Sequence, residues 1–153
     1  MHTAVFRTPL GWAGVAATGQ GISMVVLPKK DKKAVEREIK LAECKSPLTA
    51  ALSPEGRGRK KPSSSISYGS SGMLKQAVKF LQRYFSGKCV SFDLPLDMRY
   101  YTAFQQAVWK AAAEIPYGKA RSYAWIAKRV RNPRAARAVG QAMGANPVPI
   151  IIP

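Results

Sequence analysis

The first 27 residues alternate short apolar runs with turn-forming residues. The apolar runs lie near residues 3–7, 12–17 and 22–27, and the breaks at residues 8–11 and 18–21 are rich in Gly and Thr. Breaks of this composition between short β-prone runs are typical of hairpin turns. We therefore predict three strands that form a small antiparallel sheet.

Three later segments carry apolar residues every three or four positions, which is the spacing of an amphipathic helix. These segments are residues 31–43, 73–87 and 102–114. Between the last two, residues 92–96 are predicted to be extended, because the proline within them disfavours helical backbone at the preceding residue.

Two short helices are predicted near the end of the sequence. Ser122 is a good N-cap for the first. Asn132 followed by Pro133 offers an N-cap and a first-turn proline for the second, over residues 133–145. A connection as short as residues 130–132 makes the pair typical of a helix-turn-helix.

The second of these helices combines small and basic residues at its start. The run there is Arg134-Ala135-Ala136-Arg137-Ala138. Small side chains allow a helix to approach a DNA groove closely, and the two arginines can then reach phosphates or bases. The alternative is an alanine-rich core helix with solvated arginines.

Together these elements predict an α+β fold. A small antiparallel three-stranded sheet with helices is expected in residues 1–97, and a helical domain with the helix-turn-helix in residues 98–153. A basic loop at about residues 53–72 is expected to be disordered, because Pro, Gly, Ser and basic residues leave it almost without apolar content.

The charge of the chain is strongly positive and unevenly distributed. The 153 residues include 25 Lys and Arg against 8 Asp and Glu, a formal net charge of +17. Residues 115–153 contain basic residues and no acidic one, whereas acidic residues interleave with the basic ones of 29–45 and can pair with them on a helix. Such a field favours polyanions, mainly nucleic acid or an anionic membrane surface, with solubility alone as the alternative. Because the acid-free segment contains the helix-turn-helix, we favour DNA binding.

Several classes of protein and site are excluded or disfavoured. No run of 18 apolar residues exists, which excludes a membrane-spanning helix, and residues 1–10 lack a secretory signal pattern. Two cysteines make a poor disulfide framework and indicate a reducing compartment. His2, Cys44 and Cys89 lack the spacing of a zinc site, so no metal is expected.

Motifs in a fixed order run through the chain from residue 92 onward. They are FDLPL at 92–96, FQQAVW at 104–109, IPYGK at 115–119, SY at 122–123, NPRAARAVG at 132–140 and NPVPIIIP at 146–153. Together they resemble the O6-alkylguanine-DNA alkyltransferases, also called methylated-DNA–protein-cysteine methyltransferases. The N-terminal half is similar to the family in layout, with a weaker sequence signal.

The resemblance implies a DNA repair function and a fold. Such proteins bind the minor groove through the second helix of the helix-turn-helix, flip the alkylated guanine out of the duplex, and transfer the alkyl group irreversibly to their own cysteine. They need no cofactor. The implied partner is double-stranded DNA with alkylated guanine, and the protein is expected to bind it as a monomer. No association with a membrane is expected. The implied location is the nucleus or cytoplasm, or the nucleoid in a prokaryote. The implied fold is a ribonuclease H-like N-terminal domain and a winged-helix-like C-terminal domain.

Residue roles are carried over by motif. Arg137 would insert into the base stack vacated by the flipped guanine, where a guanidinium can stack and hydrogen-bond. Tyr123 would crowd the 3′ phosphate and promote rotation of the nucleotide. The expected DNA contacts are Tyr123, Arg134, Ala136, Arg137, Ala138 and Gly140, and the expected base pocket is Tyr123, Asn146, Val148 and Pro149.

Two of these residues have simpler explanations. Tyr123 is also compatible with a core tyrosine at a helix start. Asn146 would support the turn that carries the nucleophile, but it is also compatible with a plain C-terminal helix cap, since Asn tolerates left-handed backbone. Trp109 and Trp125 are assigned to packing.

The sequence departs from the family after its last motif. The family continues Ile-Ile-Ile-Pro with Cys-His-Arg, whereas the sequence ends at Pro153. We therefore expect a truncated alkyltransferase that lacks the acceptor cysteine and its activating histidine and is chemically inert. Cys44 and Cys89 lie outside the helix-turn-helix half and are not expected to substitute. The alternatives are a non-catalytic alkyltransferase-like protein that binds DNA lesions, and a helix-turn-helix transcription regulator, which does not explain residues 146–153.

Overall fold

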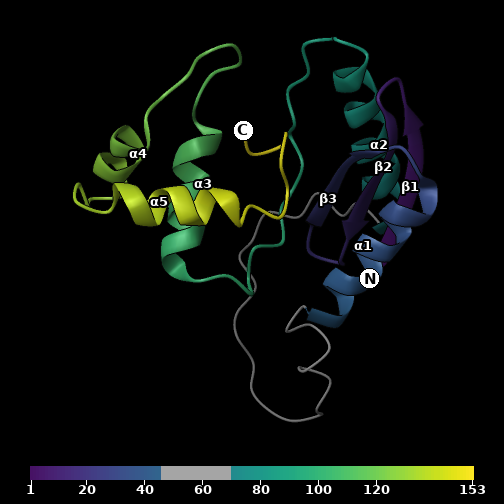
Figure 1. The fold of residues 1–153 in the computed structure, drawn as a ribbon, viewed down its shortest axis with the longest axis horizontal. Helices are drawn as coiled ribbons and strands as arrows, with labels where there is room; N and C mark the ends of the chain where they lie inside the picture. Colours follow the sequence, from purple (N-terminus) through teal and green to yellow (C-terminus); the bar gives the residue numbers. More distant parts are fainter. Residues whose placement is uncertain (46–69) are drawn as a thin grey trace.

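The computed structural model describes residues 1–45 and 70–153. Three strands, β1 (His2–Thr8), β2 (Gly11–Ala17) and β3 (Ile22–Lys29), form an antiparallel sheet in the order β1-β2-β3 (Figure 1). The predicted sheet is confirmed, and β3 is one of its edges.

The two hairpin turns use threonine in the same way. In the first, the Thr8 hydroxyl donates to the carbonyl of Gly11 at 2.8 Å and accepts from the backbone N–H of Leu10 at 3.2 Å. In the second, the Thr18 hydroxyl accepts from the backbone N–H of Gln20 at 3.1 Å. Local hydrogen bonds of this kind are the reason that threonine favours such turns.

Two helices cover opposite faces of the sheet. Neighbouring strand residues point to opposite faces, and Val25 packs in the core shared with helix α2 (Ser70–Phe85), whereas Val26 packs with Val35 and Ile39 of helix α1 (Lys32–Lys45). Both helices confirm the predicted amphipathic segments. Of the basic loop expected at 53–72, residues 53–69 lie outside the described residues, and residues 70–72 belong to α2.

The remaining described helices form the C-terminal part. They are α3 (Ala103–Ala113), α4 (Tyr123–Arg129) and α5 (Ala136–Gly144). The Thr102 hydroxyl caps α3, and Ser122 caps α4 by accepting from the backbone N–H of Trp125 at 3.2 Å, as predicted. Among the described helices, none combines the length and apolarity needed to cross a membrane.

The start of α5 differs from the prediction. Arg131 adopts a left-handed backbone with φ 58°, and the Asn132 N–H bonds back to the carbonyl of Ala127 at 2.9 Å. These features are a Schellman motif, which ends a helix. Asn132 therefore closes α4 and does not cap α5, whose N-cap is Ala135 without a side-chain hydrogen bond. The predicted helix over residues 133–145 begins three residues late, and Arg134 lies in the turn before it.

One hydrophobic core joins the sheet to the C-terminal helices. It includes Val15 and Ile22 of the sheet, Leu81 of α2, Trp109 of α3 and Val139 of α5. The indole N–H of Trp109 donates to the carbonyl of Ala142 at 2.9 Å, in keeping with its predicted packing role. The division into domains at residues 1–97 and 98–153 stays a prediction. The segment after α5, yellow in Figure 1, runs between α3 and β3.

Candidate nucleic-acid interface and base pocket

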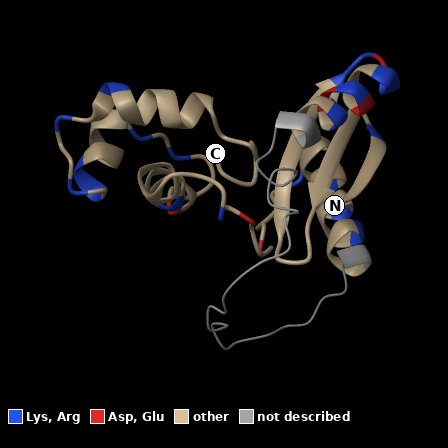
Figure 2. Ribbon diagram, turned by 90° about the horizontal axis from the view of Figure 1, so that it is seen from below, with Lys and Arg blue, Asp and Glu red and all other residues tan. Residues whose placement is uncertain are grey.

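In the helix-turn-helix half, residues 98–153, the basic residues of the acid-free segment 115–153 are all exposed. They are Lys119, Arg121, Lys128, Arg129, Arg131, Arg134 and Arg137. Figure 2 shows this half of the molecule in blue and tan with little red, because Glu114 is the only acidic residue after Asp97. Among the ion pairs of residues 1–45 and 70–153, only Arg129–Glu114 engages one of these cations. The surface thus keeps a large positive charge for an external anion.

Two of these arginines flank a tryptophan. The guanidinium carbons of Arg121 and Arg129 lie 5.7 and 5.4 Å from the ring centre of Trp125, within cation–π distance. Trp125 is half-buried and packs against the core, which agrees with its predicted packing role.

Helices α4 and α5 bring Tyr123 and Gly140 together. Tyr123 is the first residue of α4, and its side chain is half-exposed. A Cβ built on Gly140 would lie 3.3 Å from the Cδ2 and Cε2 atoms of the Tyr123 ring. Two residues that the sequence assigned to the DNA contact are therefore neighbours across the helix pair.

The other predicted DNA contacts lie on or just before α5. Arg137 is exposed on α5, and Val139, on another face of the helix, is fully buried. Ala136 and Ala138 are half-buried, and Arg134 is exposed in the preceding turn. The exposed side of α5 thus carries a cation among small residues, which is a surface that a groove can approach.

The turn after α5 is built around the side chain of Asn146. Its Nδ2 donates to the carbonyl of Ile152 at 3.0 Å, and its Oδ1 accepts from the backbone N–H of Val148 at 3.0 Å. The Ile152 N–H also donates to the carbonyl of Val148 at 3.1 Å. The C-cap of α5 is Ala145, and both Asn146 side-chain bonds lie within the following turn. This geometry favours the turn-supporting role of Asn146 over a plain helix cap.

The same turn contains a left-handed isoleucine. Ile150 has φ 76°, which is costly for a β-branched residue. Residues 150–152 therefore form a turn with an isolated bridge between Pro149 and Ile152, and not a continuous strand. Ile151 and Ile152 are buried.

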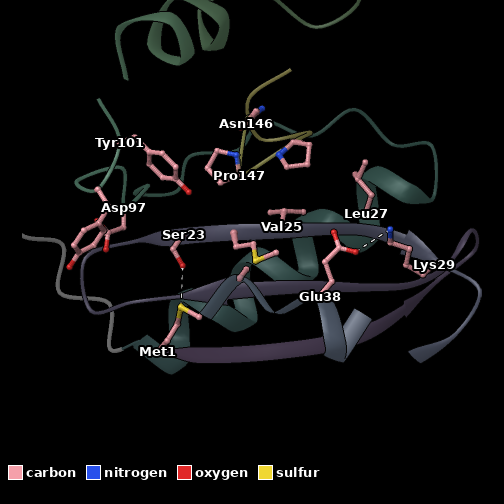
Figure 3. Close-up of a pocket in the computed structure, with 14 residues that line it drawn as sticks. Met1, Ser23, Val25, Leu27, Lys29, Glu38, Asp97, Tyr101, Asn146 and Pro147 are labelled. Carbon is pink, nitrogen blue, oxygen red and sulfur yellow. Dashed lines mark hydrogen bonds and ion pairs between the residues drawn. The ribbon is translucent and has the colours of Figure 1, made fainter. Parts of the chain in front are cut away.

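A cavity of about 480 Å³ lies between β3 and this turn (Figure 3). Asn146 and Pro149 line it, together with residues of β3, α1 and the segment 97–101. Of the other two expected pocket residues, Val148 is fully buried and Tyr123 does not line the cavity. The four predicted pocket residues are thus divided between the cavity wall, the core and the α4–α5 contact.

Residues 1–98 match the family of the 6-O-methylguanine DNA methyltransferase ribonuclease-like domain, and residues 103–153 match that of its DNA binding domain. The chain is also 33% identical to a methylated-DNA–protein-cysteine methyltransferase of Methanosarcina acetivorans, over 100% of this chain and 80% of that protein.

The chain belongs to the 6-O-methylguanine DNA methyltransferase family.

Other relatives are more similar over a shorter stretch. A methylated-DNA–protein-cysteine methyltransferase of Mycobacterium tuberculosis is 52% identical over 82 residues, which are 54% of this chain and 49% of that protein. This alignment spans about half of the relative. The crystal structure of Mycobacterium tuberculosis OGT in complex with DNA is similar to this chain, with 33% identity and a TM-score of 0.65. The alignment covers 100% of this chain and 75% of the mycobacterial protein's chain.

Asp97, which the sequence did not single out, is buried beside the cavity of this member of the methyltransferase family. Asp97 is 2% exposed and accepts from the Thr18 hydroxyl at 2.6 Å. Its two carboxylate oxygens also accept from Arg99 at 2.8 and 2.9 Å. The hydrogen bond from Arg99 lowers the pKa of Asp97, and burial opposes that effect. The only local signal was the charge pair two residues apart, since Thr18 is remote in sequence.

The two cysteines lie outside the helix-turn-helix half. Cys89 is exposed beyond the end of α2. Cys44 belongs to the last turn of α1, and its side chain is outside the described residues. Neither belongs to α3–α5 or to the Asn146 turn.

Proposed function

We propose that this chain recognises O6-alkylated guanine in duplex DNA through α4 and α5, as a monomer and without a cofactor. In this proposal α5 enters the minor groove, and Arg137 takes the place of the extruded base. The observation that carries the proposal is the contact of Tyr123 with Gly140, beside the uncompensated cations of the same helix pair. The DNA complex of the related mycobacterial protein supports DNA as the partner.

Residues 1–153 are proposed to supply recognition and not alkyl transfer. Transfer to sulfur needs a cysteine thiolate at the base pocket. The two cysteines of the chain are at positions 44 and 89 and belong to α1 and the segment after α2. The 153 residues by themselves are therefore proposed to be chemically inert.

The second candidate is a non-catalytic alkyltransferase-like protein that binds DNA lesions. In this candidate, the surface of α4 and α5 recognises the lesion without alkyl transfer.

The test compares two duplexes that differ by a single methyl group. Fluorescence anisotropy measures binding to a duplex with one O6-methylguanine and to its unmodified twin at the same salt concentration. We expect tighter binding to the methylated duplex, and equal affinities would contradict the proposal. Incubation with a duplex that carries a labelled methyl group should leave the protein unlabelled. Labelling of Cys44 or Cys89 would overturn the proposed inertness.

A further inference from the structure

The outer edge of β3 holds two segments that are distant in sequence. Ile22 donates its N–H to the carbonyl of Pro95 at 2.8 Å and accepts from the N–H of Asp97 at 2.9 Å. Three residues further along, Val25 donates its N–H to the carbonyl of Pro147 at 2.8 Å. Edge strands expose unpaired backbone groups that readily pair with other segments. Here that edge binds both the connection to α3 and the turn after α5.

The bond to Pro147 acts on a peptide group that Asn146 also binds. The carbonyl of Pro147 and the N–H of Val148 belong to one peptide unit. Val25 binds that unit at its oxygen, and the Asn146 side chain binds it at its nitrogen, at 3.0 Å. A planar peptide held at both ends has a fixed orientation. The sheet therefore contributes directly to the geometry of the Asn146 turn (Figure 3).

The connection to α3 is attached to the sheet by side chains as well. Asp97 accepts from the hydroxyl of Thr18, a residue 79 positions earlier in the second hairpin turn. The turn permits a close approach because of Gly21, where a Cβ would lie 2.6 Å from the carbonyl oxygen of Pro95. Asp97 and Thr18 thus hold the connection against the start of β3.

From the same connection, contacts continue into α5. The ring of Tyr101 packs edge-on against Trp109 with ring centres 4.8 Å apart. The Trp109 indole donates to the carbonyl of Ala142, near the end of α5. Through these contacts the sheet is linked to the last part of α5 as well as to the Asn146 turn that follows it.

We infer that Thr18 and Asp97 are positioning residues, which act through the edge of β3 to set the geometry of the Asn146 turn and hence the preference for an alkylated base. This inference rests on the proposed function for its effect on DNA binding. Its structural part, the coupling of Thr18 to the Val148 peptide, is independent of that function.

The test uses two threonines in equivalent turns. Thr18→Val removes the hydroxyl bound to Asp97 while it keeps the shape of the side chain, and Thr18→Ser restores a hydroxyl. Thr8→Val is the matched control, because Thr8 is also nearly buried in a hairpin turn but is bonded to Gly11 and Leu10. Denaturant unfolding of all variants shows whether each one folds.

Two measurements are made on each variant. Hydrogen exchange followed by NMR reports the protection of the Val148 amide, and anisotropy reports the ratio of affinities for methylated and unmodified duplex. We expect Thr18→Val to speed exchange at Val148 and to lower the affinity ratio roughly two- to thirtyfold, the range found for coupling through packed networks. Thr18→Ser should restore the slow exchange at Val148 and the affinity ratio of the parent. Thr8→Val should change neither the exchange rate nor the ratio.

The outcomes are separable. If Thr18→Val leaves Val148 exchange unchanged, or if Thr8→Val changes it equally, the positioning role is wrong. If the parent protein binds both duplexes equally, the proposed function fails, while the Val148 exchange rate still decides the structural coupling. If Thr18→Val does not fold, replacement of the Val25 amide by an ester removes the N–H bonded to Pro147 and must then speed Val148 exchange.

Discussion

The ring of Tyr123 lies against the backbone of Gly140, with 3.3 Å between its edge and the place that a Cβ would occupy. This contact joins the first residue of α4 to the middle of α5, so the two helices meet where both are predicted to touch DNA. A larger residue at position 140 must displace the ring.

Gly140→Val tests this contact. The β-branched side chain should push the Tyr123 ring away and weaken binding to methylated duplex, with a stability cost of about 1–3 kcal/mol from overpacking. Anisotropy and thermal unfolding measure the two effects. Gly144→Ala is the control, because a Cβ there meets nothing within 4 Å. That substitution should leave binding unchanged and raise stability by roughly 0.5–1 kcal/mol. Equal binding by both variants would contradict the importance of the contact.

Arg137 and Arg134 should differ in what they contribute to binding. If Arg137 enters the base stack, Arg137→Ala should weaken binding to methylated duplex by about 1–3 kcal/mol and to unmodified duplex by less. Arg134 lies in the turn before α5 and should contact phosphate, so Arg134→Ala should weaken both complexes alike. Parallel titrations of the two duplexes measure the difference. An equal loss for Arg137→Ala would make it an ordinary phosphate contact.

Binding should depend steeply on salt. The basic residues of segment 115–153 are exposed, and in the described part of the chain only Arg129 among them is in an ion pair. Each phosphate that they neutralise contributes about −0.9 to the slope of log K against log salt concentration. Titrations between low and moderate salt should therefore give a slope of several units, and Arg134→Ala should reduce it by about 1. A flat response would contradict the basic surface as the DNA contact.

Asn146 should contribute to stability through both of its side-chain bonds. Asn146→Ala leaves the N–H of Val148 and the carbonyl of Ile152 without their partner, at a cost of about 1–3 kcal/mol each if they stay dry. Asn146→Asp keeps the acceptor for Val148 but loses the donor to Ile152. Denaturant unfolding should rank the parent above both variants. A variant as stable as the parent would show that the turn does not need the side chain.

Asp97 should make stability depend on acidic pH. Its pKa is lowered in the folded protein, mainly by the hydrogen bond from Arg99. The carboxylate therefore contributes stability that is fully present above about pH 4, the ordinary aspartate value, and is lost as the pH falls through the folded value. Asp97→Asn keeps the shape without the charge. Thermal unfolding from neutral to acidic pH should show that Asp97→Asn is less stable than the parent at pH 7. The difference in stability between the two proteins should decrease as the pH falls. A constant difference would contradict the linkage.

The sequence by itself determined the features that depend on neighbouring residues. The three strands, the helices and the Ser122 cap follow from periodicity and local capping, which act within a few residues. The surplus of cations around Arg137 was also visible, because charge is a property of composition. The predicted roles of Tyr123 and Arg137 came from motifs and remain predictions.

Only the tertiary structure decided the features that need distant partners. Arg131 and Asn132 carry turn chemistry that suits a helix start or a helix end, and the bond to Ala127 selected the end. Thr18 and Asp97 are 79 positions apart. The bond from Val25 to Pro147 exists only because β3 is an edge strand in this fold. Many different partners could satisfy each of these hydrogen-bonding groups, and the packing of the whole fold determines which partner lies within reach. The residues of the expected base pocket are separated for the same reason: Val148 is buried in the core, whereas Asn146 and Pro149 line the cavity.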